Sequence, residues 1–296
     1  MTHKALFGIM LPMHNKTTNN TVYDADTAER MGSLTAVIGF VRTLRQHWPQ
    51  VRLNMAQDWH ETYRGTYMKL LWAILMPIVP MSVFMLLAKI RIFQSDGRFP
   101  AGVYIAAGIT IWMLFAETIT ITINAVRSLS HSLADAQTPL IVPLVSNYSM
   151  LFSDTAIRLL ALLVWVLIEK VPFQWYMLAF PLLFIPMIAF SIGLGLILAT
   201  FNIVLPDIDQ LTGMILRYAI FFSHAFFPLP AEAAWVAKFA YFNIPGIFVV
   251  NIRELLILGE CSQPTLFVVA SIFGVILFVL GIRTFFRLEP HIIERL

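Results

Sequence analysis

The sequence predicts an all-α polytopic membrane protein with six transmembrane helices, an N-terminal amphipathic interfacial helix and two short re-entrant helices between spans 5 and 6. Its composition is the first reason: 58% of the 296 residues are hydrophobic and 12% are charged, about half the charged share of an average soluble domain. The second reason is that the apolar residues occur in blocks, such as the uncharged run from Leu70 to Ala88. A helix of about 20 apolar residues crosses a bilayer core at 1.5 Å per residue.

The chain begins with two polar or amphipathic segments. Residues 1–34 are mostly polar and are expected to form a cytoplasmic tail, because basic residues concentrate on the cytoplasmic side of a first span. Residues 35–69 mix apolar and basic side chains in a pattern that suits a helix on the membrane surface, with Trp48 and Trp59 at headgroup level. Pro49 should interrupt this segment, so two shorter helices are predicted there.

Residues 70–290 are predicted to form the membrane domain. The six spans are expected at about residues 70–88, 101–126 and 148–168, within the uncharged run 171–205 together with both of its interfaces, from Met214 onward, and at 261–282. Between spans 5 and 6, the region of about residues 228–259 is broken by prolines and by semi-polar stretches. Such backbone is tolerated at membrane depth only where protein or a water-filled cavity surrounds it, which predicts the re-entrant helices. Six spans place both termini on the same side, and the distribution of Lys and Arg favours the cytoplasm.

A carboxylate near the middle of the second span is the first candidate for function. Thr110, Glu117, Thr120 and Asn124 share one face of a helix with this spacing. Because polar groups in a membrane are costly, this stripe avoids lipid. It therefore faces either a translocation pathway or another helix in a hydrogen-bonding seam, and the sequence leaves both open.

Other polar and small residues in the spans have structural interpretations. Asp154 and Arg158 are four residues apart on the third span, so they are expected to pair along one helix face. Gly195 and Ala199 are typical of close helix packing. His224 is expected to be a satisfied interior histidine rather than a metal ligand.

Sequence signals for catalysis are weak. There is no phosphate-binding Gly-x-x-x-x-Gly-Lys loop, no Cys/His cluster with zinc spacing, and only one cysteine. Asp207 with Asp209 could be a metal-binding pair of a sugar transferase, and His131 with Asp135 an acyl-transfer pair. Both are two-residue signals in loops, and contact with a cytosolic partner explains these loops more simply. The net charge of +3 comes largely from the N-terminal region and does not indicate nucleic-acid binding.

Several short segments, taken together in order and spacing, resemble a known family. They are Tyr63-Arg64-Gly65 followed by Leu71-Trp72-Ala73-Ile74-Leu75-Met76-Pro77, then Tyr104-Ile105-Ala106-Ala107-Gly108 with Trp112 and Phe115, then Asn202-Ile203-Val204-Leu205-Pro206-Asp207-Ile208, then Asn243-Ile244-Pro245 with Arg253. This pattern resembles the membrane subunit of ABC-2 type exporters, in the branch that includes O-antigen, capsule and teichoic acid permeases. Pro206 departs from the usual Arg before the aspartate, and Ser223-His224 stands where Ser-Pro is common.

The resemblance implies a permease subunit of an ATP-driven exporter that moves a lipid-linked polysaccharide across the bacterial cytoplasmic (inner) membrane. It also implies a homodimer with two copies of an ABC nucleotide-binding subunit. The chain itself would be no enzyme and would bind no cofactor, since ATP and Mg would lie on the partner subunit, and no nucleic acid is expected. The alternatives are an ABC-2 exporter of a small lipid or drug, an intramembrane glycosyl- or acyltransferase, and an assembly scaffold.

The same resemblance assigns roles to individual residues, with no catalytic residue and no metal ligand among them. Aromatic faces stack on sugar rings, so the aromatic candidates for the substrate channel are Trp112, Phe115, Tyr148, Phe221, Phe222 and Phe226. Glu117 is a further candidate, as the carboxylate of the polar stripe. The residues expected to couple to the ATPase are Asp135, Pro139, Pro206, Asp207 and Asp209. The expected interfacial gate consists of Tyr63, Arg64 and Trp72.

Overall fold

The computed structural model describes residues 33–63, 100–132, 141–172, 180–226 and 242–294, with a few isolated positions between 71 and 90 and between 174 and 177. These residues form eight α-helices and one short 3-10 helix, and they contain no strand. The all-α prediction is therefore confirmed for the part of the chain that the structure describes. The tail 1–32 and most of the first predicted span lie outside the described residues.

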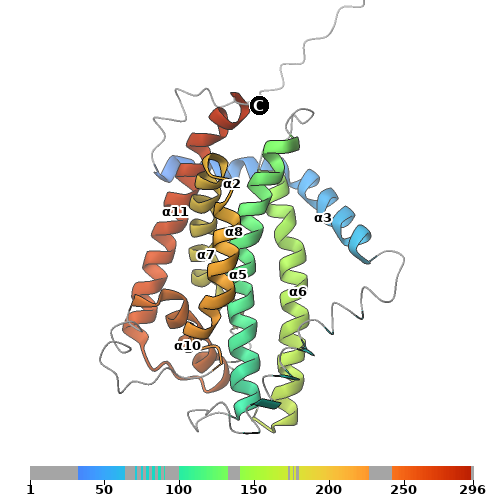
Figure 1. Cartoon of the computed structure of the whole chain (residues 1–296), viewed down its shortest axis with the longest axis vertical. Helices are drawn as coiled ribbons and strands as arrows, with labels where there is room; N and C mark the ends of the chain where they lie inside the picture. Colours follow the sequence, from blue (N-terminus) through green and yellow to red (C-terminus); the bar gives the residue numbers. More distant parts are fainter. Residues whose placement is uncertain are drawn as a thin grey trace, which may run out of the picture.

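Four long helices form the body of the molecule; α5, α7 and α11 run in one direction along its long axis and α6 runs in the other (Figure 1). They are α5 (Ala101–Ser132), α6 (Ile141–Ile168), α7 (Phe180–Val204) and α11 (Pro264–Glu294). Within the described residues, these four are long and apolar enough to cross a membrane. The chain is therefore a membrane protein with several apolar helices.

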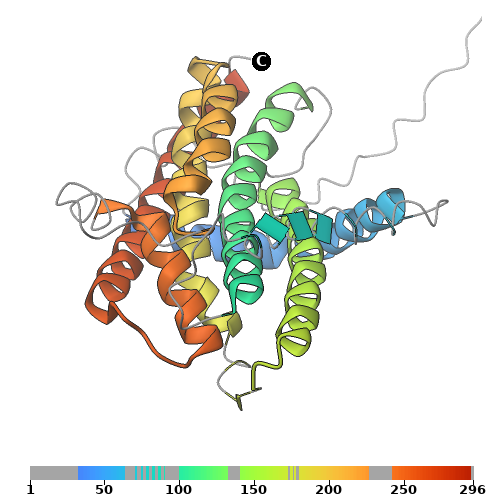
Figure 2. The same cartoon turned by 60° about the horizontal axis from the view of Figure 1, so that its bottom comes forward.

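Shorter helices cover the two ends of this bundle. α2 (Ser33–Gln46) lies across one end, which we call the α2 end, and α3 (Trp48–Tyr63) extends outward from it (Figure 1). α10 (Ile244–Ile257) lies at the opposite end, the α10 end, between α11 and α5 (Figure 2). α8 (Ile208–Ala219) descends from the α2 end beside α5 and α7, and the 3-10 helix η2 (Ile220–Phe222) continues it.

The predicted division of the N-terminal amphipathic segment is confirmed. α2 ends at Gln46 and α3 begins at Trp48, so Pro49 occupies the first turn of α3, where its missing N–H costs no helical hydrogen bond. Val51 of α3 is fully buried against Ile141 and its neighbours at the start of α6. Trp48 and Trp59 expose about half of their surface, as residues at a membrane interface do.

Two predicted span boundaries are wrong. α6 begins at Ile141 rather than near residue 148, because its first two turns pack against α3. α7 lies within the uncharged run 171–205, where the fourth span is expected. The fifth helix begins at Ile208 rather than Met214 and has only 12 residues, so the six-span count is not reached within the described residues.

Glycines bring α7 and α11 into backbone contact. A Cβ added to Gly193 of α7 would lie 2.5 Å from the backbone of Leu277 on α11, and one added to Gly281 would lie 2.6 Å from the carbonyl oxygen of Gly193. On its other side α7 packs on α5, where a Cβ on Gly195 would lie 2.7 Å from Thr122, and Ala199 is 1% exposed. The predicted close packing at Gly195 and Ala199 is thus confirmed.

Candidate functional site

An ion pair joins α5 to α6 near the middle of the two helices. Both terminal nitrogens of the Arg158 guanidinium donate to the Glu117 carboxylate, each at 2.6 Å. The Arg158 side chain is 10% exposed and that of Glu117 is 34% exposed. This two-pronged geometry is the strong form of an Arg–carboxylate contact, and it neutralises both groups inside the apolar bundle.

The predicted pairing of Arg158 with Asp154 is therefore wrong. Residues four apart on one helix can meet, but the guanidinium of Arg158 instead reaches across to α5, where Glu117 offers both carboxylate oxygens. Asp154 remains half-buried one turn away on α6. Opposite charges on two consecutive spans were the signal in the sequence that could have indicated the interhelical pair.

The second half of α5 has one exposed side among the residues that the structure describes, and the polar stripe occupies it. Thr120, Asn124 and Arg127 are exposed, and the partly exposed Glu117 lies one turn before them. Most of the rest of α5 is buried by α6, α7, α8 and α10. Thr110, which the sequence places on the same face, is instead fully buried, and its hydroxyl donates to the Ala106 carbonyl at 2.8 Å.

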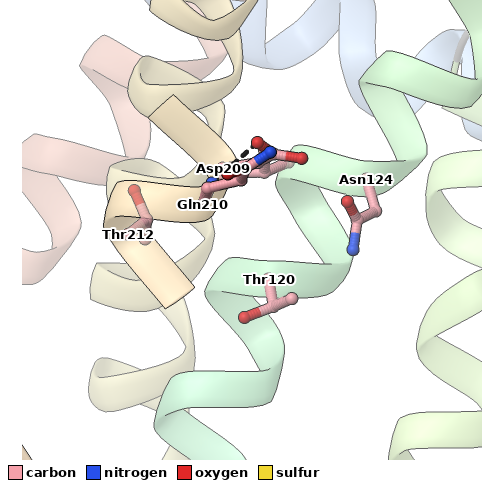
Figure 3. A pocket seen from close by; sticks show the side chains of 6 residues that line it. Thr120, Asn124, Asp209, Gln210 and Thr212 are labelled. Carbon is pink, nitrogen blue, oxygen red and sulfur yellow. Dashed lines mark hydrogen bonds between the residues drawn. The ribbon is translucent and has the colours of Figure 1, made fainter. Parts of the chain in front are cut away.

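Beside this stripe, α5 and α8 enclose a half-open cleft near the α2 end. Its volume is about 130 Å³, and its lining is Thr120, Ile123, Asn124, Asp209, Gln210 and Thr212. Figure 3 shows Thr120 and Asn124 one turn apart on α5, with Asp209 and Gln210 across from them on α8. Of these residues, the sequence singled out Thr120, Asn124 and Asp209, whereas Gln210 and Thr212 carried no signal.

The start of α8 is fixed by contacts with α5 and α7. The Arg127 guanidinium binds the Asp209 carboxylate in an ion pair. The Asp209 backbone N–H donates to the side-chain oxygen of Asn202 at 3.1 Å, and Asn202 is buried at the end of α7. Pro206 and Asp207 form the exposed turn between α7 and α8. Among the residues predicted to couple to an ATPase, Pro206 and Asp207 are thus exposed and can contact a partner. Asp209 instead contacts its own chain. Asp135 and Pro139 lie outside the described residues.

Most of the predicted channel aromatics pack inside the subunit. Trp112 and Phe115 are 4% and 2% exposed, with ring centroids 5.3 Å apart, and Phe115 also stacks on Phe190 of α7. Tyr148 is buried, and its hydroxyl lies 2.6 Å from that of Thr122. These contacts make the three residues part of the helix packing, and their role in a channel stays a prediction.

The other three predicted aromatics lie where α8 ends. Phe221 and Phe222 are exposed on η2, whereas Phe226 is 4% exposed, and its ring centroid lies 5.4 Å from that of Phe221. Of the predicted gate residues, Tyr63 is the last residue of α3. Arg64 and Trp72 lie outside the described residues.

A tight turn follows η2 and is held by α5 and α10. The Arg253 guanidinium donates to the His224 carbonyl at 2.8 Å and lies 3.5 Å from the centroid of the Tyr104 ring, an attractive cation–π geometry. His224 has a φ of 62°, in the left-handed region. Its Nδ1 is buried without a partner among the described residues, so the prediction of a satisfied histidine is wrong for this atom. A Cβ on Gly108 would lie 2.2 Å from the Ala225 carbonyl, so only glycine lets this turn reach α5.

α10 is anchored by polar side chains as well as by apolar packing. Asn243 caps its first turn by accepting from the Gly246 backbone N–H at 3.2 Å. Asn251, fully buried, accepts from the Cys261 thiol at 3.0 Å and from the backbone N–H of Gln263 at 3.2 Å. Within the described residues, no group of three or more His, Cys, Asp or Glu side chains could hold a metal ion.

Comparison with known proteins identifies the family. Residues 49–257 match the model of the ABC-2 type transporter family, which is more than half of the chain. The chain belongs to the ABC-2 type transporter family. This ABC-2 permease is also similar to the O-antigen export system permease protein RfbA of Myxococcus xanthus, with 23% identity over 193 residues that cover 65% of this chain and 74% of the relative.

Family membership decides several of the open alternatives. The permease is a transporter subunit and not an enzyme, so the transferase interpretations of Asp207 with Asp209 and of His131 with Asp135 no longer apply. As an ABC-2 permease, it acts with an ABC ATPase partner. The resemblance inferred from the sequence motifs is confirmed.

Proposed function

We propose that this permease exports a lipid-linked polysaccharide, driven by ATP hydrolysis on two copies of its ATPase partner. It acts as a homodimer in the bacterial cytoplasmic membrane, with six spans per subunit and re-entrant helices between spans 5 and 6. ATP and Mg bind to the partner, and this chain carries no cofactor. Both termini are cytoplasmic, so the α2 end faces the cytosol and the α10 end faces outward.

The exposed polar stripe on α5 carries this proposal. A hydrophobic cargo could leave through lipid or through an aliphatic passage, whereas a polysaccharide needs hydrogen-bonding groups along its path. Thr120 and Asn124 offer such groups on the open side of α5, the most buried of the four described spans. Exposed polar groups within a membrane are costly unless they face a cavity or another subunit. The relative from Myxococcus xanthus is named as a permease for O-antigen, which agrees with this class of cargo.

A second copy of the chain would turn the open stripe into an enclosed path. α8 lies beside the stripe and exposes large apolar side chains, Leu211, Met214, Ile215 and Tyr218, each between 49% and 60%. Such a face is suited to packing against the same helix of a second subunit. In that arrangement the aromatic residues Phe221 and Phe222 lie near the outer part of the path.

The cytoplasmic assignment of the α2 end agrees with the charges there. The exposed turn at Pro206 and Asp207 would contact the ATPase, and Arg127 with Asp209 would pass its movement to α5. The amphipathic helices α2 and α3 would lie in the inner interface, where basic residues such as Arg42, Arg45 and Arg52 meet anionic headgroups.

Deletion of the gene tests the proposed cargo. In the deletion strain, surface polysaccharide should disappear and lipid-linked glycan should accumulate inside, as measured by gel analysis of surface glycan and mass spectrometry of extracted lipids. A plasmid copy should restore export. Normal surface glycan, together with loss of resistance to a drug or loss of a small lipid from the outer leaflet, would refute the proposal in favour of the other ABC-2 export class.

A further inference from the structure

We propose that the cleft between α5 and α8 binds one uncharged sugar ring of the cargo at the inner mouth of the path. This inference rests on the proposed function and specifies its substrate site. The cleft volume of about 130 Å³ is close to that of an enclosed cavity of about 150 Å³ that binds benzene, and because the cleft is half-open, a sugar ring can enter it while its outward hydroxyl groups stay outside. The cleft is thus of a size to hold one ring of a chain rather than a whole ligand.

The lining has the donors and acceptors that sugar hydroxyls require. The amides of Asn124 and Gln210 and the hydroxyl of Thr212 have no hydrogen-bond partner among the described residues. The Thr120 hydroxyl donates to the Ala116 carbonyl at 3.0 Å, so its oxygen remains an acceptor. Ile123 adds an apolar surface, which suits the C–H face of a ring.

The charge of the cleft selects against an anionic ligand. Among the described residues that line the cleft, Asp209 is the only ionisable group, and Arg127 neutralises it through their ion pair. The pair also fixes the position of α8 relative to α5, and with it the width of the cleft. A phosphate or carboxylate would meet neutral amides and an occupied guanidinium, whereas a neutral polyol can both donate to and accept from this lining.

The place of the cleft along α5 also fits a path. Asn124 lies two turns from Glu117 towards the α2 end, about 10 Å at 1.5 Å per residue. A ring held here would therefore stand between the inner surface and the middle of the membrane. It would bind on the stripe that the path follows.

Cysteine labelling tests occupancy of the cleft directly. Cys261 is the only cysteine of this chain, so Cys261→Ser gives a background in which Thr120→Cys is the sole thiol of the permease, and labelling is read on the permease after it is separated from the ATPase. The full transporter, with its ATPase, is labelled with a small neutral maleimide in membrane fragments that are open on both faces. The membranes come from cells that make the lipid-linked glycan and from cells blocked in its first glycosyl transfer.

Cargo should slow the labelling of the introduced thiol about three-fold when it is present at twice its Kd, because the free fraction falls as 1/(1 + [L]/Kd). The matched control is Thr284→Cys, since the Thr284 hydroxyl also bonds to the carbonyl four residues earlier, at 3.1 Å, but lies on α11 away from the cleft. Its labelling should be the same in both membranes. Equal rates at position 120, or no labelling there at all, would overturn the proposal.

Export measurements test the sugar site independently of the proposed function. Asn124→Leu and Gln210→Met should each lower surface glycan roughly five-fold at equal protein level, the effect of about one lost hydrogen bond. Asn54→Leu, on α3, is the control and should export normally. If the deletion strain loses its surface glycan but both cleft variants export normally, the proposed function stands and the sugar site is refuted. If the deletion strain keeps its surface glycan, the proposed function is refuted.

Discussion

The ion pair between Glu117 and Arg158 makes a quantitative prediction about stability. Glu117→Gln removes the negative charge and leaves one acceptor for a guanidinium that has two hydrogen bonds of 2.6 Å in the native protein. Breaking a buried ion pair by removing one partner costs about 3–5 kcal/mol. Because the Glu117 side chain is 34% exposed and Asp154 lies one turn from Arg158, we expect a smaller loss, about 2 kcal/mol.

Thermal aggregation of the detergent-solubilised protein measures this loss. Membrane proteins commonly unfold irreversibly, so variants are compared at one heating rate by the monodisperse fraction that survives. At about 2–4 °C per kcal/mol for a chain of this size, the midpoint should fall by about 4–8 °C. Asp154→Asn, which removes a carboxylate that does not bind the guanidinium, should lower it by less than half as much.

A double variant separates a paired charge from a general effect of substitution. Glu117→Gln with Arg158→Gln removes both charges, so it should be more stable than Glu117→Gln alone, because no buried charge is left unpaired. An unchanged midpoint for Glu117→Gln would refute the reasoning, and so would a double variant whose loss equals the sum of the two single losses. Export per folded molecule, measured for the same variants, distinguishes a helix–helix seam from a part of the transport path.

Three further predictions concern other parts of the fold. Gly193→Ala should lower the stability of the fold by about 1–3 kcal/mol, since the added Cβ would lie 2.5 Å from the α11 backbone. The control is Gly213→Ala, whose Cβ would have nothing within 4 Å; in the same heating assay it should be neutral or stabilising by about 0.5–1 kcal/mol. Asp207→Lys should reduce the amount of ATPase that co-purifies with the tagged permease, because this exposed turn is the proposed contact; Asp209→Asn should keep the ATPase bound but lower export, and the opposite pattern would contradict the assignment. Burial raises the pKa of the Cys261 thiol, so less thiolate is present near pH 7. Maleimide should therefore label Cys261 more slowly than it labels glutathione, and the rate should rise about ten-fold per pH unit up to that pKa. A labelling rate equal to that of glutathione would contradict the raised pKa.

The sequence predicts the helices of this protein better than it predicts their partners. Blocks of apolar residues identify α5, α6, α7 and α11, and Pro49 marks the division between α2 and α3. These features are local, because membrane solvation and backbone geometry act on each segment by itself. The boundaries fail where a neighbouring helix extends a segment, as α3 does for the first turns of α6.

The partners in the polar contacts could be identified only from the three-dimensional arrangement of the helices. The i,i+4 rule gave Arg158 a partner on its own helix, but two donors and two acceptors across an interface make a better pair than a neighbour one turn away. The aromatic side chains of Trp112 and Phe115 indicated a channel by analogy, yet their helix turns them into the core. Thr120 and Asn124 were correctly chosen as polar positions, but the cleft also needs Gln210 and Thr212, which only the packing of α8 on α5 brings near.

The short fifth helix has a consequence for the outer mouth of the proposed path. α8 and η2 together extend about 24 Å, at 1.5 and 2.0 Å per residue, against a hydrocarbon thickness of about 30 Å. The turn after η2 meets α5 at Gly108, seven residues after the first residue of that helix, so the chain reverses about 10 Å from the end of α5. A mismatch of this kind would thin a bilayer that met the end of the helix, but in the proposed dimer α8 faces the second subunit rather than lipid. The outer mouth of the proposed path should therefore be recessed below the membrane surface, at the depth where this helix ends.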